Sequence, residues 1–191
     1  MKHLVVVRHS ISKQEPRKSS HEWALTDEGQ VRLALLANSV EKYKLSKIFA
    51  GIEPKMQQTG QGLASKLDVP VEIAPDLHET LRETAPYFED VDQFRAAIKA
   101  AMDEPEALLY GEETFDDAYT RFNECVRELT VTNPNQSIGV VTGGTVLALF
   151  IHRKSGLDTY KVWRSLTMPC YAVFTLPDLN FLELVTEPFK S

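Results

Sequence analysis

The sequence has few of the features that mark metal proteins, disulfide-rich proteins or membrane proteins. Its 191 residues include two cysteines, Cys125 and Cys170, which are too few for a disulfide framework and lack the spacing of a zinc site. We expect both to be buried or half-buried thiols. No apolar run is long enough to cross a bilayer, and the chain begins Met-Lys-His without a signal peptide. These absences predict a cytoplasmic protein with no membrane partner.

Several motifs of cofactor-dependent and hydrolytic enzymes are also missing. The chain has no P-loop, no G-x-G-x-x-G fingerprint, no H-E-x-x-H zinc motif and no G-x-S-x-G nucleophile elbow. We therefore predict no metal site and no cofactor. The net charge of −6 argues against nucleic acid as the main partner. A local basic pocket on an acidic protein can still bind a small anion.

The order of expected elements predicts an α/β fold. Hydrophobic residues make up 43% of the chain and charged residues 25%, which is typical of one globular domain, here residues 1–191. Strands alternate with helices, so we predict a single three-layer α/β/α domain with a mostly parallel sheet and an antiparallel C-terminal edge. The expected strands are 3–7, 47–51, 69–73, 137–142, 171–176 and 181–187, and the expected helices are 25–43, 53–67, 90–102, 114–130 and 145–156.

The first strand ends in two residues that suit phosphoryl transfer. The stretch LVVVRHS runs from a valine-rich strand directly into Arg8 and His9. In parallel sheets the ligand site lies beyond the carboxyl ends of the strands. A guanidinium matches phosphate oxygens with a rigid fork of donors, and an imidazole nitrogen can attack phosphorus. The alternative is a histidine that caps a backbone carbonyl beside a surface arginine. We expect His3, His21 and His152 to be solvated or hydrogen-bonded side chains.

Six short segments occur in one order along nearly the whole chain. They are VVVRHS, WALTDEG with RLALLA, EPKMQQTGQGLA, PDLHETLR, GEETFDDAYTRF and VVTGGTVLAL. Together they resemble the histidine phosphatase superfamily, and in particular its small bacterial phosphatase-like members. The resemblance implies a phosphoglycerate mutase-like fold and a metal-independent phosphatase that forms a phosphohistidine intermediate.

The resemblance also implies roles for the residues of the first strand and the following helix. His9 would take the phosphoryl group, with Arg8 holding it. Ser10 replaces the glycine of the family's Arg-His-Gly motif, and its hydroxyl would touch a phosphate oxygen. Lys55 replaces an arginine in the helix after the second strand. It would keep the charge at the phosphate but lose the bidentate fork.

A second group of residues would complete the site. Glu79 matches the carboxyl acid that protonates the leaving oxygen, and we expect burial beside a phosphate to keep it partly neutral near pH 7. Arg82, three residues later, would reach the same phosphate. The late strand departs from the family's Ser/Thr-His-Gly pattern, because Gly143, or Thr142 if the match shifts by one, stands where the second histidine belongs. Backbone N–H groups at Gly143 would still face an anion, and a histidine restored there should raise activity.

Two hypotheses of different classes remain open. The first is a phosphomonoester hydrolase that is weakened by the loss of the second histidine. The second is an impaired protein of the same fold that binds a phosphorylated ligand without turning it over. Both take a small phosphorylated substrate or inorganic phosphate as partner. Sugar phosphates, nucleotides and phosphoproteins all fit, and a homodimer is left open.

Overall fold

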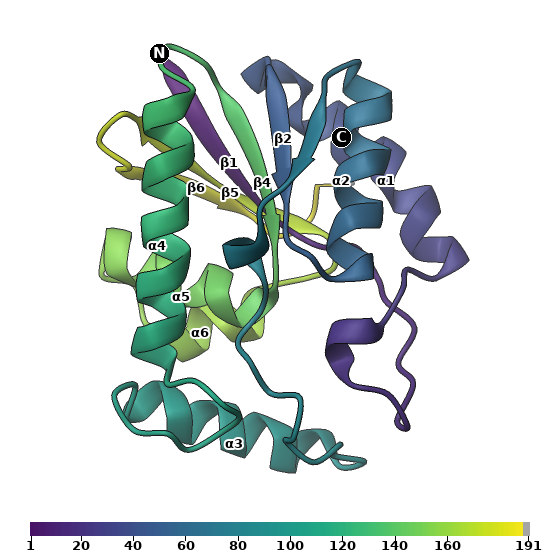
Figure 1. The fold of residues 1–191 in the computed structure, drawn as a ribbon, viewed down its shortest axis with the longest axis vertical. Helices are drawn as coiled ribbons and strands as arrows, with labels where there is room; N and C mark the ends of the chain where they lie inside the picture. Colours follow the sequence, from purple (N-terminus) through teal and green to yellow (C-terminus); the bar gives the residue numbers. More distant parts are fainter. Residues whose placement is uncertain (189–191) are drawn as a thin grey trace.

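The computed structural model describes residues 1–188, which form one six-stranded sheet covered by helices on both faces (Figure 1). The sheet has the order β3-β2-β4-β1-β5-β6. The neighbouring pairs among the first four strands in this order are parallel, whereas β5 runs antiparallel to both β1 and β6. The mixed sheet confirms the predicted fold class. The strands are β1 (Lys2–Arg8), β2 (Lys47–Ala50), β3 (Val71–Ile73), β4 (Ile138–Thr142), β5 (Cys170–Leu176) and β6 (Phe181–Val185).

The helices lie close to the positions that the sequence pattern predicts. Thr26, Asp90 and Thr114 each accept a backbone hydrogen bond in the first turn of the helix that follows, as expected of N-cap residues. One helix, α6 (Thr159–Ser165), is absent from the sequence-based assignment because seven residues are too few to show a periodic pattern. The others are α1 (Asp27–Val40), α2 (Pro54–Leu67), α3 (Val91–Asp103), α4 (Phe115–Thr132) and α5 (Gly144–Ser155), with short 3₁₀ helices η1 (Ser20–Glu22), η2 (Glu41–Tyr43) and η3 (Pro75–Leu77).

Alternate side chains of β1 enter two separate hydrophobic cores. Val5 and Val7 pack with buried residues of α1 and α2, whereas Leu4 and Val6 pack with buried residues of α4 and α5. Successive strand residues point to opposite faces, so a strand that is apolar throughout is buried on both. Cys170 is buried in the second of these cores and Cys125 is half-buried, both as free thiols, as expected.

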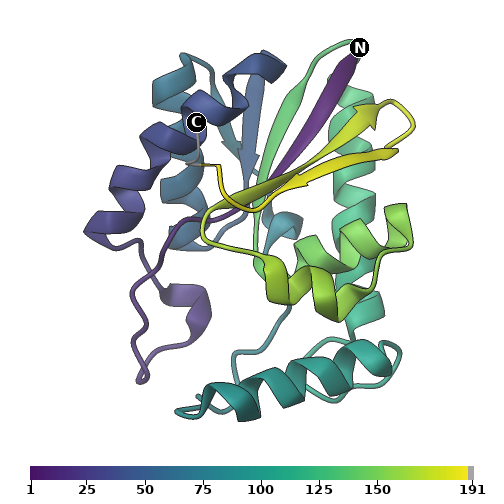
Figure 2. The same cartoon turned by 180° about the vertical axis from the view of Figure 1, so that it is seen from behind.

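The elements that extend beyond the carboxyl ends of the parallel strands enclose the functional end of the molecule. In Figures 1 and 2, α3 and the loop that carries η1 lie at the end of the molecule opposite the N-terminus. The loop after β1 is held to the start of α1, where the amide of Thr26 donates to the carbonyl of Ile11 at 2.9 Å. Helix α3 approaches α6 on the other side of this end.

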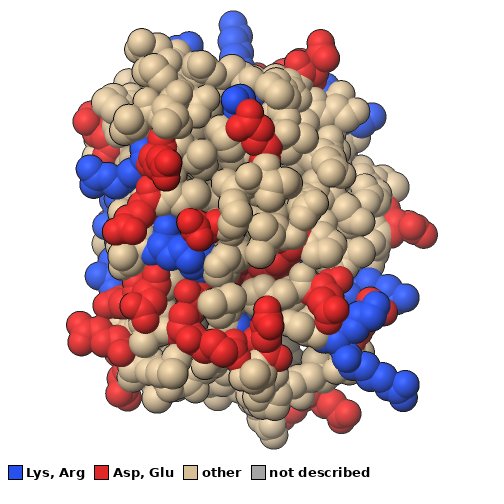
Figure 3. Space-filling model, in the orientation of Figure 1, with Lys and Arg blue, Asp and Glu red and all other residues tan. Residues whose placement is uncertain are grey.

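Acidic side chains gather on the lower half of the face shown in Figure 3, at the level of α3 and the start of α4. Asp92 lies in the first turn of α3, and Asp116 and Asp117 lie in the first turn of α4. A basic pocket in this end of the molecule therefore contrasts with the acidic surface around it. Among the described residues, no helix has the length and apolar character needed to cross a membrane.

Candidate active site

Two neighbouring parallel strands bring the first motif and the late glycine motif together. Arg8, the last residue of β1, pairs with Thr142, the last residue of β4. The amide of His9 then donates to the carbonyl of Thr142 at 3.1 Å. His9 and Gly143 therefore leave the sheet side by side, as the sequence predicts for adjacent strand ends.

The imidazole of His9 is buried and held in one tautomer. Its Nδ1 lies 2.8 Å from the carbonyl oxygen of Ser10, which can only accept, so Nδ1 carries the proton and donates it. The lone pair is thereby left on Nε2. Burial, together with the charges of Lys55 and Arg8, lowers the pKa of His9 to about 3. The ring is consequently neutral at physiological pH, which is the protonation state of a nucleophile.

The guanidinium of Arg8 lies flat against the start of α5. Its Nη1 donates to the carbonyl of Leu166 at 2.8 Å, while its Nε is buried and has no hydrogen-bond partner among the described residues. A Cβ atom at Gly144 would lie 2.8 Å from that Nε, so only glycine leaves room for the arginine here. A buried cationic donor without an acceptor favours an anionic ligand.

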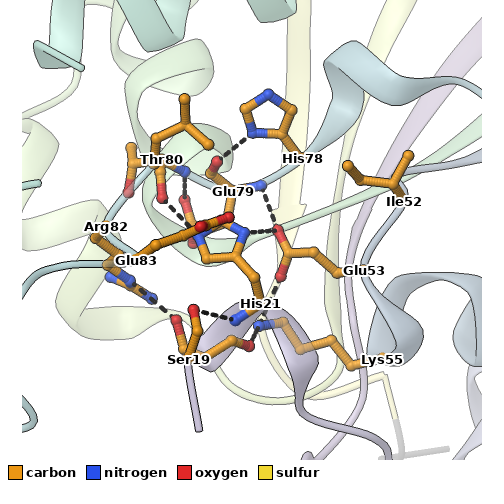
Figure 4. A network of polar contacts seen from close by, with 12 residues as sticks. Ser19, His21, Ile52, Glu53, Lys55, His78, Glu79, Thr80, Arg82 and Glu83 are labelled. Carbon is orange, nitrogen blue, oxygen red and sulfur yellow. Dashed lines mark hydrogen bonds and ion pairs between the residues drawn. The ribbon is translucent and has the colours of Figure 1, made fainter. Parts of the chain in front are cut away.

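Lys55 belongs to a buried network that joins three segments of the chain (Figure 4). Its Nζ lies 2.7 Å from Glu53 and donates to the carbonyl of Ser20 at 2.5 Å. The other oxygen of Glu53 lies 3.3 Å from Nδ1 of His21 and accepts the amide of Glu79 at 2.7 Å. Glu53 therefore fixes the lysine, the η1 loop and the start of the Glu79 segment at once.

The charges of this network depend on one another. Burial lowers the pKa of Lys55, whereas the carboxylate of Glu53 raises it. Burial alone would raise the pKa of Glu53, yet hydrogen bonds and charges from His21 and Lys55 hold it below its ordinary value. The carboxylate of Glu53 thus opposes the effect of burial and favours the charged form of the lysine.

Arg82 brings a further cation to the same place. Its Nε donates to the hydroxyl of Ser20 at 3.4 Å, and its guanidinium carbon lies 5.7 Å from the centre of the Phe94 ring. Its Nη1 is buried and lacks a hydrogen-bond partner within the described part of the chain. Arg8 and Arg82 therefore each present a buried N–H group without an acceptor.

The carboxylate of Glu79 occupies the N-terminus of α5. It accepts the amides of Thr145 at 2.9 Å and Val146 at 3.1 Å, and that of Thr80 at 2.9 Å. Burial alone would raise its pKa, but Arg82 and these N–H groups hold the pKa of Glu79 below its ordinary value. The helix N-terminus therefore favours the ionised form of Glu79, and the expectation of a partly neutral acid, which depends on a phosphate beside it, stays a prediction.

These side chains line a pocket of about 450 Å³, a size that suits a small-molecule ligand. Of the seven site residues that the sequence predicts, five line it and two do not. The two that do not line the pocket are Ser10 and Gly143. The five that line the pocket are Arg8, His9, Lys55, Glu79 and Arg82.

Comparison with known proteins identifies the family. The model of the histidine phosphatase superfamily (branch 1) matches residues 4–176. The chain belongs to the histidine phosphatase superfamily. No curated protein sequence matches it significantly.

Solved structures of other proteins share this fold at low sequence identity. An alpha-ribazole phosphatase from Shigella flexneri has a TM-score of 0.74 and 18% identity, covering 99% of this chain and 98% of its own. YhfR from Bacillus stearothermophilus has a TM-score of 0.75 and 18% identity, covering 100% and 98%. A mycobacterial glucosyl-3-phosphoglycerate phosphatase in complex with inorganic phosphate has a TM-score of 0.69 and 16% identity, covering 96% and 95%. The same phosphatase has also been solved with VO3.

Gly143 stands where the superfamily resemblance leads one to expect a histidine. A Cβ atom built on it would lie 2.4 Å from the carboxyl carbon and Oε2 of Glu79, and 2.7 Å from the Cβ of Glu79. Its backbone is extended, so the glycine is required by space and not by its dihedral angles. A histidine restored here would require Glu79 to move, so the expected gain in activity stays a prediction that depends on this movement.

The helix that begins after Gly143 also differs from the predicted anion site. The amides of Thr145 and Val146 already donate to Glu79, so a bound anion would have to compete with this carboxylate for them. In the structure, the start of this helix holds Glu79.

Ser10 contributes to the fold beneath the site. Its hydroxyl donates to the carbonyl of Gly29 at 2.8 Å, and its amide donates to the hydroxyl of Thr59 at 3.0 Å. The side chain is fully buried and both groups are used. Ser10 ties the end of β1 to α1 and α2, which fixes the loop that carries His9.

Sequence reasoning missed Glu53 and His21. Glu53 precedes a proline at the start of a helix, where an acidic residue usually serves the helix dipole, and His21 lies in a polar loop. The signal that could have found the first was the pair Glu53 and Lys55, two opposite charges in a segment where the family-like motif needs a cation. Across residues 1–188, no three His, Cys, Asp or Glu side chains gather in a way that could hold a metal ion.

Proposed function

We propose that this protein hydrolyses small phosphate monoesters through a phosphohistidine formed at His9. The observation that carries the proposal is a neutral, buried imidazole with a free Nε2 in a pocket where Arg8 and Arg82 present buried N–H groups without acceptors. A phosphoryl group would satisfy both guanidinium groups and the charge of Lys55. Phosphate in the mycobacterial relative supports the same ligand class.

The first step would transfer the phosphoryl group to His9. Nε2 attacks phosphorus, the N–P bond forms and the ester P–O bond breaks. A phosphate monoester has a second pKa of about 6, so part of it carries one proton near neutral pH. That proton would leave with the alcohol oxygen, which balances the step without an acid from the protein. The cations of the pocket stabilise the charge on the transferring oxygens.

The second step would return the histidine to its neutral form. A water molecule attacks phosphorus, the N–P bond breaks, and inorganic phosphate leaves. Because Arg82 and backbone amides lower the pKa of Glu79, we assign it the role of the base that accepts the proton of this water and passes it to the phosphate. This role replaces that of an acid in the first step.

A second candidate function is a phospho-ligand-binding protein that does not turn over. It is favoured by the contacts of Glu79, whose carboxylate accepts hydrogen bonds from three backbone amides that stabilise its ionised form. The pocket would bind the same ligand class, so the two candidates differ only in chemistry. An assay of turnover separates them.

The decisive experiment measures phosphate release from phenyl phosphate and traps the intermediate. We expect turnover between pH 5 and 7, since His9, with its pKa of about 3, stays neutral across this range. Quenching in alkaline detergent should leave phosphate on the peptide that contains His9, and acid should remove it. Turnover with no phosphate on His9 would contradict the mechanism. Saturable phosphate binding without turnover would support the second candidate.

Glu53 should control the pH range over which phosphate binds. In a Glu53→Gln variant the buried Lys55 loses the carboxylate that raises its pKa, so it will lose its proton at a lower pH. We expect phosphate binding at pH 8 to weaken about tenfold, with a smaller effect at pH 6. Calorimetric titration at several pH values measures this. The control is Glu22→Gln, which removes a charge from an exposed residue of η1. Identical pH profiles for the two variants would show that Glu53 does not support the lysine.

A further inference from the structure

The outer wall of the pocket is aromatic, and the proposed chemistry does not use it. Phe88, Phe94 and Tyr110 form a triangle, with ring centres 6.1 to 6.3 Å apart. Trp163 of α6 adds a fourth ring, 5.7 Å from that of Phe94. All four residues line the pocket, and we call them the aromatic wall. They come from α3, from the segments on either side of it and from α6, which faces α3 in Figure 2.

Packing against the hydrophobic core does not bury all of the apolar surface of the aromatic wall. Phe94, Tyr110 and Trp163 are only partly buried where they pack against the core, and they also line the pocket. Next to them, Tyr87 is 42% exposed and Val91 is 53% exposed, and both also line the pocket. A contiguous apolar surface at the mouth of a polar pocket marks a binding site for an apolar group.

Arg82 joins the aromatic wall to the phosphate end of the pocket. Its guanidinium lies over the ring of Phe94, and its buried Nη1 still lacks an acceptor among residues 1–188. A phosphoryl group held by Arg82 would therefore lie directly beside the wall. The alcohol part of the ester, one bond beyond the phosphoryl oxygen, would extend along these rings.

The charges at the mouth of the pocket do not favour a substrate that carries a charged group in addition to its phosphoryl group. Arg17 and Lys18 line it on the side of the η1 loop, and Glu83 and Glu89 line it on the side of α3. Lys18 is paired with Glu15 at 3.1 Å, and both of these side chains are partly exposed. With both signs present, discrimination between substrates falls to shape and to apolar contact.

We propose that the substrates are phosphate monoesters whose alcohol carries an uncharged aromatic ring, which stacks against the aromatic wall. This inference rests on the proposed function for the phosphoryl end of the pocket. The volume of about 450 Å³ accommodates a phosphoryl group together with a ring of this kind. Offset or edge-on contacts with several aromatic rings favour a planar group over a flexible polar chain of similar size.

The test compares 2-phenylethyl phosphate with ethyl phosphate. Both are esters of primary alcohols, so the acidity of the leaving alcohol is similar and the ratio of their kcat/KM values reports contact with the ring. We expect 2-phenylethyl phosphate to be favoured by roughly tenfold to a hundredfold. Equal kcat/KM values for the two esters would overturn the inference and leave the proposed function standing.

Variants locate the effect in the aromatic wall. Phe88→Ala should reduce the ratio of kcat/KM for 2-phenylethyl phosphate to kcat/KM for ethyl phosphate to less than about threefold. Phe88→Leu serves as a second variant. It keeps an apolar side chain and should therefore retain more of the preference for the phenyl ester than Phe88→Ala. Tyr119→Ala is the control, because Tyr119 contacts Phe150 on α5 and does not line the pocket. Because both esters are measured on the same variant, the ratio does not depend on how much of the protein is folded.

A binding measurement covers the case in which neither ester is hydrolysed. That result would overturn the proposed function, and the ring preference would then be measured with 2-phenylethylphosphonate and ethylphosphonate. These compounds keep the charge of the phosphoryl group and have no ester bond to break. Calorimetry should show tighter binding of the phenyl compound by roughly tenfold or more. Equal affinities would overturn the inference independently of catalysis.

Discussion

Replacing His9 with asparagine is expected to lower kcat/KM for phosphate monoesters by at least about 10⁴-fold, because the amide of asparagine cannot take the phosphoryl group. The amide of asparagine can keep the hydrogen bond that Nδ1 of His9 makes to the carbonyl of Ser10. It does not supply the lone pair of Nε2. The loss should therefore fall on kcat, measured in single-turnover and steady-state assays with phenyl phosphate.

Phosphate binding separates a lost nucleophile from a collapsed pocket. Phosphate should stabilise the His9→Asn variant against thermal unfolding about as much as it stabilises the original protein, since Arg8, Lys55 and Arg82 remain. Arg8→Ala is the matching variant, which removes a guanidinium with an unpartnered Nε and should lose most of the protection. If His9→Asn retained more than about a hundredth of the activity, a phosphohistidine would not be the intermediate.

The second large effect is expected for the smallest possible change at Gly143. A Gly143→Ala variant places a methyl group 2.4 Å from the carboxyl carbon of Glu79, so either the carboxylate or the start of α5 must move. Overpacking together with the loss of charged hydrogen bonds to Thr145 and Val146 should lower the free energy of unfolding by about 3 kcal/mol or more. Urea denaturation monitored by circular dichroism measures the change.

A double-mutant cycle identifies the source of this cost. In a Glu79→Gly background both the carboxylate and the Cβ that crowd position 143 are absent, so Gly143→Ala should cost less than about 1 kcal/mol. A cost that is equal in both backgrounds would mean that Glu79 is not the obstacle. The same geometry predicts no gain in activity for Gly143→His while Glu79 remains in place.

The layout of the sheet and the cations of the pocket were predictable from the sequence because both depend on local patterns. A valine-rich strand that ends in Arg8 and His9 can be recognised from a few consecutive residues. The carboxyl ends of parallel strands meet at one edge of the sheet, wherever the strands lie in the sequence. Short motifs in a fixed order supplied Lys55, Glu79 and Arg82. Each of these lines the pocket, since the distances between them follow from the fold.

The state of each group was not predictable, because it depends on partners that are distant in sequence. The pKa of Glu79 is lowered by contacts with Arg82 and with backbone amides of α5, more than sixty residues away. Ser10 was assigned to phosphate on its chemistry, yet Gly29 and Thr59 use its hydroxyl and amide. Glu53 looked like an ordinary helix-start residue until its three contacts were visible. Burial and pairing decide such roles, and neither can be derived from a motif.

The position of β1 in the middle of the sheet has a consequence for the newly made chain. This strand is synthesised before both of its partner strands, β4 (Ile138–Thr142) and β5 (Cys170–Leu176). Its backbone therefore has no partner strand until β4 has been made, a delay that exposes its apolar residues to aggregation and makes them a target for chaperones. The reactive imidazole is likewise unplaced during this time, because the carbonyl that receives its amide belongs to Thr142. A fragment released before β4 emerges would thus expose apolar residues and lack the contact that places His9.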